Sequence, residues 1–313
     1  PDRNGKDDTY GLCMGMDSAV LNQSFVNIFA AFGVPFNRNV QLEDGTVTSY
    51  MLHPNYLDVI MYYRKLYQNK VIEPEFATIP TMTLLERLWN GVGGIWCGNA
   101  TATTQNWLGR YTEDPKPTFD YTTIYGPEGY GGSNKQYQTR FWGISAKSKH
   151  PEAAMELANY LTSEEGEELL YLGVEGVYYK WLDEEKTQYE FIPPYDDAAV
   201  HRVEGGYSYY DLFMRNTENV MYRTANELTK KGIKLGLDTA LDDAFIFAPM
   251  EAERKYGDTL ASITLEALSQ LIVTKGDVEK EYRQFVERWL NEGGREFQEE
   301  ATRLYKEQIE RNK

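Results

Sequence analysis

Apolar residues recur with helical spacing in several stretches of the chain, often bounded by Pro or Gly. The spacing predicts helices over residues 18–32, from Pro54 onward, over 83–89, and from Pro151 to about 161. Thr162 and Glu165 have the spacing of a capping box, which predicts a further helix that ends at Gly173. The last three predicted helices lie around residues 260–271, 278–289 and 297–305, and Gly293 and Gly294 separate the last two.

Short apolar runs between the predicted helices are typical of strands. They cover residues 12–16, 92–97, 119–125 and 141–145. From about residue 216 onward the pattern is helical. Strands alternating with helices, followed by a helical C-terminal region, predict the α/β class. A length of 313 residues favours about two domains, so a two-lobed α/β protein is expected.

The charge of the chain argues against two classes of partner. Lys and Arg number 32 and Asp and Glu number 48, so the formal net charge is −16. A field of that sign repels phosphate backbones and anionic lipid headgroups, so neither nucleic acid nor a membrane surface is an expected partner. No run approaches the roughly 18 consecutive apolar residues of a membrane span.

The aromatic content suggests a class of ligand, and the two cysteines give no sign of a metal site or a disulfide. The chain has 24 Tyr, 13 Phe and 6 Trp, which suit partly wet surfaces and the apolar faces of sugar rings. Cys13 and Cys97 lack the spacing of a metal motif, and no rule of spacing supports a disulfide between them. Cys97 follows an apolar run, which favours a buried thiol.

Nothing in the spacing of the titratable residues selects a catalytic site. His53, His150 and His201 are isolated, and no zinc-protease, nucleophile-elbow or Gly-rich phosphate motif occurs. Carboxylates are plentiful, so a glycoside hydrolase with a carboxylate pair is the alternative to a binding protein. A plain interaction module is a third possibility.

The N-terminal segment has a pattern that suits calcium. Asp2, Asn4, Lys6 and Asp8 would supply oxygen ligands from alternate residues, with Gly5 at the sharp turn, as at positions three to nine of a calcium loop. The first ligand would precede Pro1, and Gly11 stands where a loop of this kind has Glu. A turn rich in Asp and Asn, without metal, is the alternative.

Four blocks of sequence resemble one family when taken in order. The opening segment to Gly11 is similar to a "DPDGNGK-D-YG" loop, and residues 84–107 are similar to an "F-GK-GM … W" segment. Residues 141–179, from Phe141-Trp-Gly-Ile-Ser to Gly173-Val-Glu-Gly-Val-Tyr-Tyr179, form the most specific block. Residues 285–306 are similar to a C-terminal "F-W—GG … YK". The chain thus resembles extracellular solute-binding proteins of carbohydrate ABC importers, in particular the Gram-positive lipoprotein branch for larger oligosaccharides.

The resemblance implies a fold, a function and a location. It implies a two-lobed periplasmic-binding-protein-like fold in which the first half of the N-terminal lobe is absent. Residues 1–138 and 185–313 would belong to the C-terminal lobe, and residues 139–184 would be the return segment of the N-terminal lobe. It also implies a cell-surface lipoprotein that binds an oligosaccharide between its lobes, closes around it and delivers it to a membrane permease without a catalytic step.

Five residues are candidates for contact with the sugar. Asn99 and Trp107 follow the predicted strand 92–97, where ligands of α/β sheets bind, although Trp107 can equally pack on its own lobe. Arg140 and Trp142 flank the expected crossover between the lobes, where Arg140 would grip hydroxyl groups or form an ion pair. Asp17, between a predicted strand and a helix, would bind hydroxyl groups or cap the helix.

Overall fold

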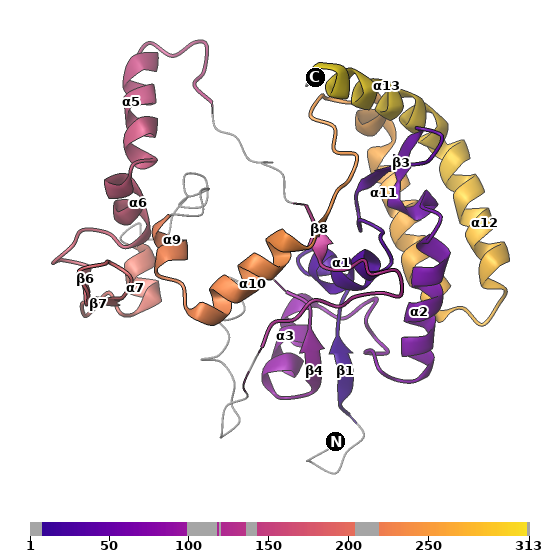
Figure 1. The fold of residues 1–313 in the computed structure, drawn as a ribbon, viewed down its shortest axis with the longest axis horizontal. Helices are drawn as coiled ribbons and strands as arrows, with labels where there is room; N and C mark the ends of the chain where they lie inside the picture. Colours follow the sequence, from indigo (N-terminus) through magenta and orange to yellow (C-terminus); the bar gives the residue numbers. More distant parts are fainter. Residues whose placement is uncertain (1–7, 99–117, 119, 136–142, 204–218, 312–313) are drawn as a thin grey trace. The chain divides into compact units, whose positions relative to one another are not determined.

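The computed structural model describes residues 8–98, 118, 120–135, 143–203 and 219–311 (Figure 1). The chain forms two compact units. The first unit consists of Pro1–Gln136 and Lys231–Lys313, and the second of Tyr137–Lys230. Each unit is considered by itself below.

A pair of parallel strands organises the first unit. β1 (Tyr10–Cys13) pairs with β4 (Gly93–Trp96), with Leu12 opposite Ile95 and Cys13 opposite Trp96. Leu12 also forms an isolated parallel bridge with Ile72 on its other side. Figure 1 shows the two strands side by side, with α3 (Thr81–Trp89) beside β4. Their carboxyl ends therefore meet at one edge.

Helices and short strand pairs surround this sheet. After β1 come α1 (Leu21–Ala31), the antiparallel pair β2 (Asn39–Gln41) and β3 (Val47–Ser49), the short helix η1 (Tyr50–Leu52), and α2 (Tyr56–Gln68). Farther along the chain β5 (Ser133–Asn134) pairs in parallel with β8 (Ala240–Leu241). The C-terminal helices are α11 (Glu251–Val273), α12 (Val278–Trp289), the turn η3 (Leu290–Gly294) and α13 (Arg295–Arg311).

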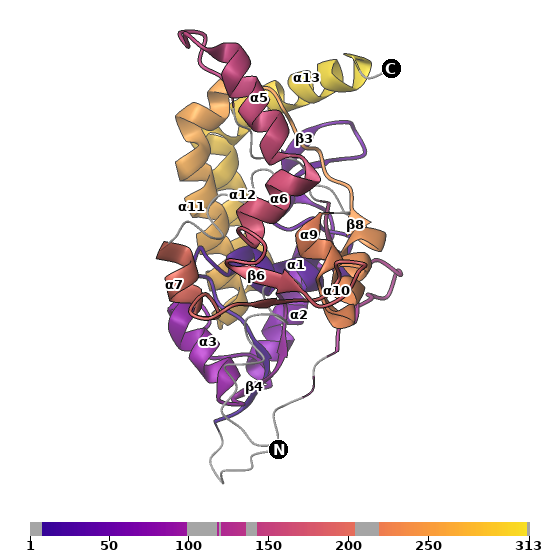
Figure 2. The same ribbon diagram turned by 90° about the vertical axis from the view of Figure 1, so that its left-hand side faces the viewer.

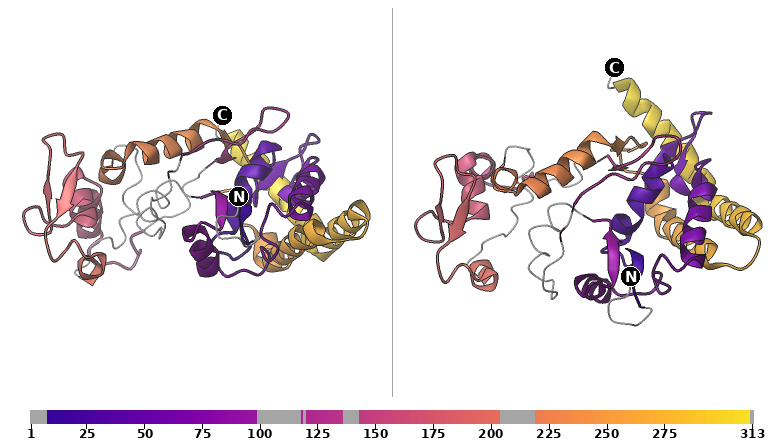
Figure 3. Two further views of the ribbon diagram at one scale, coloured as in Figure 1. Left: turned by 90° about the horizontal axis from the view of Figure 1, so that it is seen from below. Right: turned by 60° about the horizontal axis from the view of Figure 1, so that its bottom comes forward.

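Figure 3 shows α11 and α12 running side by side, in accordance with their contacts. Gly293 in the turn η3 has a φ of 117°, a left-handed value that favours glycine. This non-helical residue separates α12 from α13.

The core of the first unit is rich in aromatic rings. Phe25, Phe29 and Phe36 pack against Tyr50 and Tyr63, and Phe25 stacks on Phe36 with ring centroids 5.3 Å apart. One buried charge joins two helices. The guanidinium of Arg64 on α2 donates to the carbonyl oxygens of Leu271 and Thr274 at the end of α11, at 3.0 and 2.6 Å. Arg64 therefore satisfies carbonyl groups that the end of a helix leaves without a partner in the helix.

The second unit has its own apolar cluster. Its helices are α5 (Pro151–Leu161), α6 (Glu164–Tyr171), α7 (Ala198–Val203) and α9 (Val220–Arg223), and its hairpin consists of β6 (Tyr179–Trp181) and β7 (Tyr189–Phe191). In Figure 2, the β6–β7 hairpin lies at the end of α6 that is remote from α5. The buried residues of the apolar cluster in the second unit are Tyr171, Leu172, Tyr179 and Val220. The helix α10 (Glu227–Asp238) contains the boundary to the first unit.

Most of the predicted helices are confirmed, with shifted ends. The helices predicted over 18–32, from Pro54, over 83–89, from Pro151 and near the C-terminus correspond to α1, α2, α3, α5 and α11–α13. The cap before α6 is Ser163 rather than Thr162: the Ser163 hydroxyl accepts from the Gly166 N–H at 3.2 Å. Residues 242–250 are not helical, which corrects the expectation of a helical chain from residue 216 onward.

Two predicted strands are absent from the described residues. In the segment predicted over 119–125, only Tyr125 forms an isolated bridge, with Gly131. In the segment predicted over 141–145, residues 143–145 are irregular. Alternation of apolar residues favours a strand only where a neighbouring strand supplies hydrogen-bond partners, and apart from the bridge of Tyr125 these segments pair with no strand that the structure describes.

The compact units do not share all their ends with the predicted lobe segments, which stay predictions. The first change of unit falls at 136–137, close to the predicted 138–139, but the second falls at 230 and not at 184. The reason is local pairing: β6 precedes residue 184, β7 follows it, and the two strands form one hairpin. Which lobe each unit corresponds to stays a prediction. Within the described ranges, no helix is long and apolar enough to cross a membrane.

Candidate ligand-binding site

The carboxyl edge of the β1–β4 pair is the described part of the predicted sugar site. After β1 the chain continues through the fully buried Met14 to Met16, whose N–H donates to the Phe76 carbonyl oxygen at 3.0 Å. The Gly15 N–H donates to the Ser24 hydroxyl at 3.0 Å, which ties this edge to α1. Asp17, the next residue, is exposed at the mouth of the edge. Its placement after the strand agrees with the prediction.

Asp17 is held by backbone and side-chain donors. Its Oδ1 accepts from the Ala19 N–H at 3.1 Å. The pKa of Asp17 is lowered first by this hydrogen bond from Ala19, and then by hydrogen bonds from Thr81 at the start of α3. A carboxylate at that position also faces the positive end of the α3 dipole. The following helix, α1, has Val20 as its cap and no side-chain hydrogen bond there, so Asp17 does not cap that helix, which was the alternative expected from its position.

An ion cluster that the sequence did not suggest lies beside this edge. Glu73 follows Ile72, and its side chain is almost completely buried. Arg87 on α3 donates to Glu73 and, at 3.2 Å, to Glu75 Oε2, and the Glu75 N–H donates to Glu73 Oε1 at 3.3 Å. These bonds raise the pKa of Arg87. Both carboxylates are engaged by one guanidinium, so the cluster holds α3 on the sheet. The apolar pair before Glu73 was the only sequence signal, and it is too short to define a strand.

The two cysteines are free and lie on opposite faces of the strand pair. Cys13 packs with Ile79 and Leu84, whereas Cys97 belongs to the main core. Cys13 lies opposite Trp96, so Cys97, the next residue after Trp96, points to the other face. Burial raises the pKa of Cys13 to about 11 and that of Cys97 to about 12.

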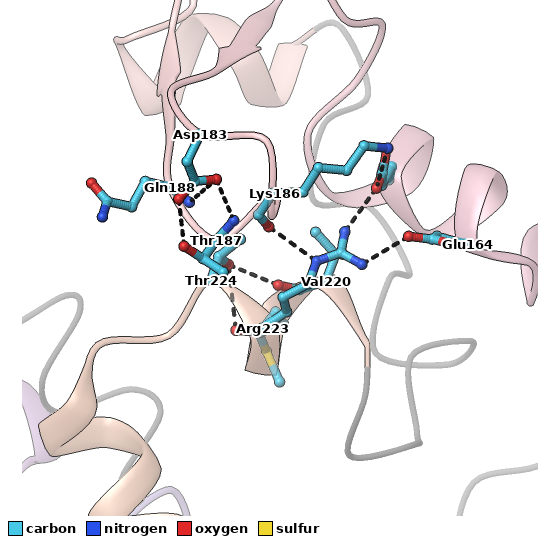
Figure 4. Close-up of polar contacts among 10 residues, drawn as sticks. Glu164, Asp183, Lys186, Thr187, Gln188, Val220, Arg223 and Thr224 are labelled. Atoms are coloured by element: carbon cyan, nitrogen blue, oxygen red, sulfur yellow. Dashed lines mark hydrogen bonds and ion pairs between the residues drawn. The ribbon is translucent and has the colours of Figure 1, made fainter.

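The second unit has a polar cluster around Arg223 (Figure 4). Arg223 on α9 donates to Glu164 Oε1 at 2.9 Å and to Glu168 Oε1 at 2.7 Å, both on α6, and through Nε to the Lys186 carbonyl oxygen at 3.0 Å. The Lys186 ammonium donates to both Glu168 oxygens at 3.2 Å. The guanidinium also lies 5.6 Å from the centre of the Trp181 ring. With three donors of Arg223 occupied, the cluster joins the hairpin to two helices and offers no open grip for a ligand.

The other predicted site residues fall outside the described part of the chain. These are Asn99, Trp107, Arg140 and Trp142 for the sugar and Asp2, Asn4 and Lys6 for calcium. Asp8 is described, just before β1. Within the described ranges, no group of three His, Cys, Asp or Glu side chains could hold a metal ion. Of the predicted site residues, the described ranges therefore contain Asp17 and Asp8.

Comparison with known proteins adds a family to this geometry. The family described as bacterial extracellular solute-binding protein matches residues 28–168. Two proteins of Bacillus subtilis (strain 168) are each 23% identical to the chain. They are Lipoprotein LipO, over 97% of the chain, and the polygalacturonan/rhamnogalacturonan-binding protein YtcQ, over 98%. The chain spans only about three fifths of their length, 62% and 61% respectively.

Solved structures are similar in fold. One is described as an HMO-binding, ABC-transporter-associated solute-binding protein from Bifidobacterium longum infantis, with a TM-score of 0.64 and 16% identity. The similarity covers 97% of this chain and 66% of that one. The resemblance carried by the four sequence blocks is thus confirmed: the chain is similar to bacterial extracellular solute-binding proteins and has the α/β class of fold of these two-lobed proteins.

Proposed function

We propose that the protein to which this chain belongs is the extracellular solute-binding component of an ABC importer and that it binds an oligosaccharide. The family match over residues 28–168 carries this proposal. The polygalacturonan/rhamnogalacturonan-binding relative and the HMO-binding structural neighbour support a carbohydrate as the ligand class. The lipoprotein relative supports attachment at the cell surface, and the family supports a membrane permease as the partner.

The proposed sugar site lies at the carboxyl edge of β1 and β4. There Asp17, Asn99 and Trp107 would supply polar groups and an aromatic platform, and Arg140 and Trp142 from the expected crossover are further candidates. No step of bond cleavage is proposed.

Calorimetric titration of the whole protein with a panel of oligosaccharides tests both parts of the proposal. We expect one sugar to bind and to be recovered unchanged. Trp107→Ala should then weaken binding by about 1–3 kcal/mol, the scale of one large ring face, with Tyr160→Ala in the second unit as the control. Release of a shorter product would show an enzyme, and binding that Trp107→Ala leaves unchanged would remove Trp107 from the site.

We also propose a structural calcium ion bound by the N-terminal loop. Asp2, Asn4, Lys6 and Asp8 would supply oxygen ligands, and the metal would tie this loop to β1, which begins two residues after Asp8. Calcium should raise the melting temperature of the whole protein, and Asp8→Ala combined with Asn4→Ala should abolish that increase. An equal increase in the variant, or none in the parent, would contradict the proposal.

A further inference from the structure

A groove on the first unit lies away from the edge where Asp17 stands. It has a volume of about 420 Å³ and runs between α2 and the turn at residues 126–129. Its lining consists of Ala31, Phe32, Asn55, Asp58, Met61, Tyr62, Lys65, Pro127 and Glu128. Phe32 follows α1, whereas Asp17 precedes it. The 11 residues of α1 place these ends about 16 Å apart, so the groove is separate from the proposed cleft.

Two aromatic rings form one part of the groove. The centroids of Phe32 and Tyr62 lie 5.7 Å apart, with an angle of 51° between the ring planes. Tyr62 is 41% exposed and the neighbouring Met61 is 50% exposed. Large apolar side chains exposed side by side in a concave surface provide a contact face for an apolar or amphipathic ligand.

The charged groups of the groove are available for a ligand. Asp58, Lys65 and Glu128 all line it, and all three residues are exposed. In the part of the chain that the structure describes, none of their charged groups takes part in a hydrogen bond or ion pair. Each can therefore donate or accept without first breaking an internal contact. Together they offer two acceptors and one donor around the rings.

The backbone holds the opposite wall in place. A Cβ on Gly126 would lie 1.7 Å from the Ala31 carbonyl oxygen, so only glycine permits this close approach of the turn to α1. The Gly126 N–H donates to the Tyr130 carbonyl oxygen at 2.8 Å, and the Asn27 amide donates to the Gly132 carbonyl oxygen at 2.7 Å. Asn55 joins the start of α2 to the Phe32 carbonyl oxygen at 2.9 Å. A wall fixed before binding lowers the entropic cost of taking up a ligand.

We propose that this groove is an accessory site for one or two rings of a neutral sugar. The tilted pair of aromatic rings suits the apolar C–H face of a pyranose, and the carboxylates and the ammonium suit its hydroxyl edge. Two carboxylates against one ammonium disfavour an anionic sugar. The site goes beyond the proposed transport function, because it needs neither the second unit nor a permease.

Ligand-observed NMR titration of the full chain tests the site. The probes are cellotriose and maltotriose as neutral sugars, trigalacturonate as an anionic sugar, and choline as a cation that aromatic rings and carboxylates would also attract. We expect a neutral probe to bind with a dissociation constant in the range of about 1 mM, as a shallow open site allows. Tyr62→Ala should raise that constant about tenfold, equivalent to about 1.4 kcal/mol. Tyr160→Ala, which removes a tyrosine of similar exposure, should leave it unchanged.

Two further variants keep the test sharp. Gly126→Ala should displace the wall and weaken binding, whereas Gly143→Ala, where a Cβ meets nothing within 4 Å, should not. Trp107→Ala should leave binding in the groove intact, which separates this site from the proposed cleft. The proposal is overturned if no neutral probe binds, if trigalacturonate or choline binds more tightly through Tyr62, or if Tyr62→Ala, shown to be folded by circular dichroism, binds like the parent.

Discussion

At the scale of single residues, position along the sequence predicted where a side chain lies better than what it contacts. Asp17 lies at the mouth of the strand edge, as expected, but its carboxylate accepts from Ala19 and Thr81 and does not cap α1, whose cap is Val20. Its partner Thr81 is 64 positions away, and no local spacing indicates that contact. Arg64 is a comparable case. A charged residue on a helix is usually exposed, yet the Arg64 guanidinium is buried against the end of α11.

Removing the Arg64 guanidinium should be costly. Arg64→Ala leaves the carbonyl oxygens of Leu271 and Thr274 without their donor in a buried place. We expect the free energy of unfolding of the first unit to fall by about 2–3 kcal/mol, the range for hydrogen bonds to a charged group. The neighbouring Lys65→Ala, at an exposed position, should change it by no more than about 0.5 kcal/mol. Denaturant titration of both variants measures the difference in unfolding free energy. Equal losses would show that the buried hydrogen bonds of Arg64 do not stabilise the first unit.

At the scale of elements, the helices were largely predictable and the strands were not. Helical spacing is an internal property of a segment, so α2, α5 and α12 could be placed from sequence. A strand depends on a partner from elsewhere. The segment 119–125 alternates like a strand but has only the bridge from Tyr125 to Gly131, and no local pattern indicated the pairing of β6 with β7 across residue 184.

The β6–β7 hairpin should depend on Arg223 more than on its own cross-strand ion pair. Arg223→Ala removes its bonds to the Lys186 carbonyl oxygen in the hairpin and to Glu164 and Glu168 on α6, and leaves only the direct bond from Lys186 to Glu168. Because these groups are partly buried, we expect the hairpin amides to lose about 2–3 kcal/mol of protection against hydrogen exchange. Lys180→Ala breaks an exposed pair with Glu190 and should cost at most about 1 kcal/mol. Comparable loss in both variants would contradict the assigned role of Arg223.

At the scale of the whole molecule, composition predicted the class and the number of units but not where they divide. The predicted lobe boundary at 184 came from likeness to a family. The compact units change at 230 instead, because β6, β7 and α9, on both sides of residue 184, contribute to one apolar cluster. The site is less predictable than the fold for a further reason. Four of its five candidate residues lie outside the described chain, so their roles rest on likeness alone.

Separate apolar clusters predict separate unfolding. The buried residues of the main core all belong to the first unit, and those around Tyr179 all belong to the second. Scanning calorimetry should therefore resolve two thermal transitions. Arg64→Ala should lower the melting temperature of the first unit, and Arg223→Ala should lower that of the second unit. For each kcal/mol of unfolding free energy lost, the melting temperature should fall by about 4–8 °C in the smaller unit and by about 2–4 °C in the larger unit. A single transition that both variants lower equally would show one cooperative body.

The placement of the two thiols decides how the chain behaves in oxidising surroundings. A thiolate is the form that attacks a disulfide or an oxidant, and at neutral pH a thiol with a pKa of about 11 is ionised in only about one molecule in ten thousand. The strand pair lies between Cys13 and Cys97, so forming a cross-link would require the sheet to open. The folded chain is thus chemically inert toward its own oxidation. In the oxidising surroundings that the proposed function implies, both thiols should therefore stay reduced while the fold is intact.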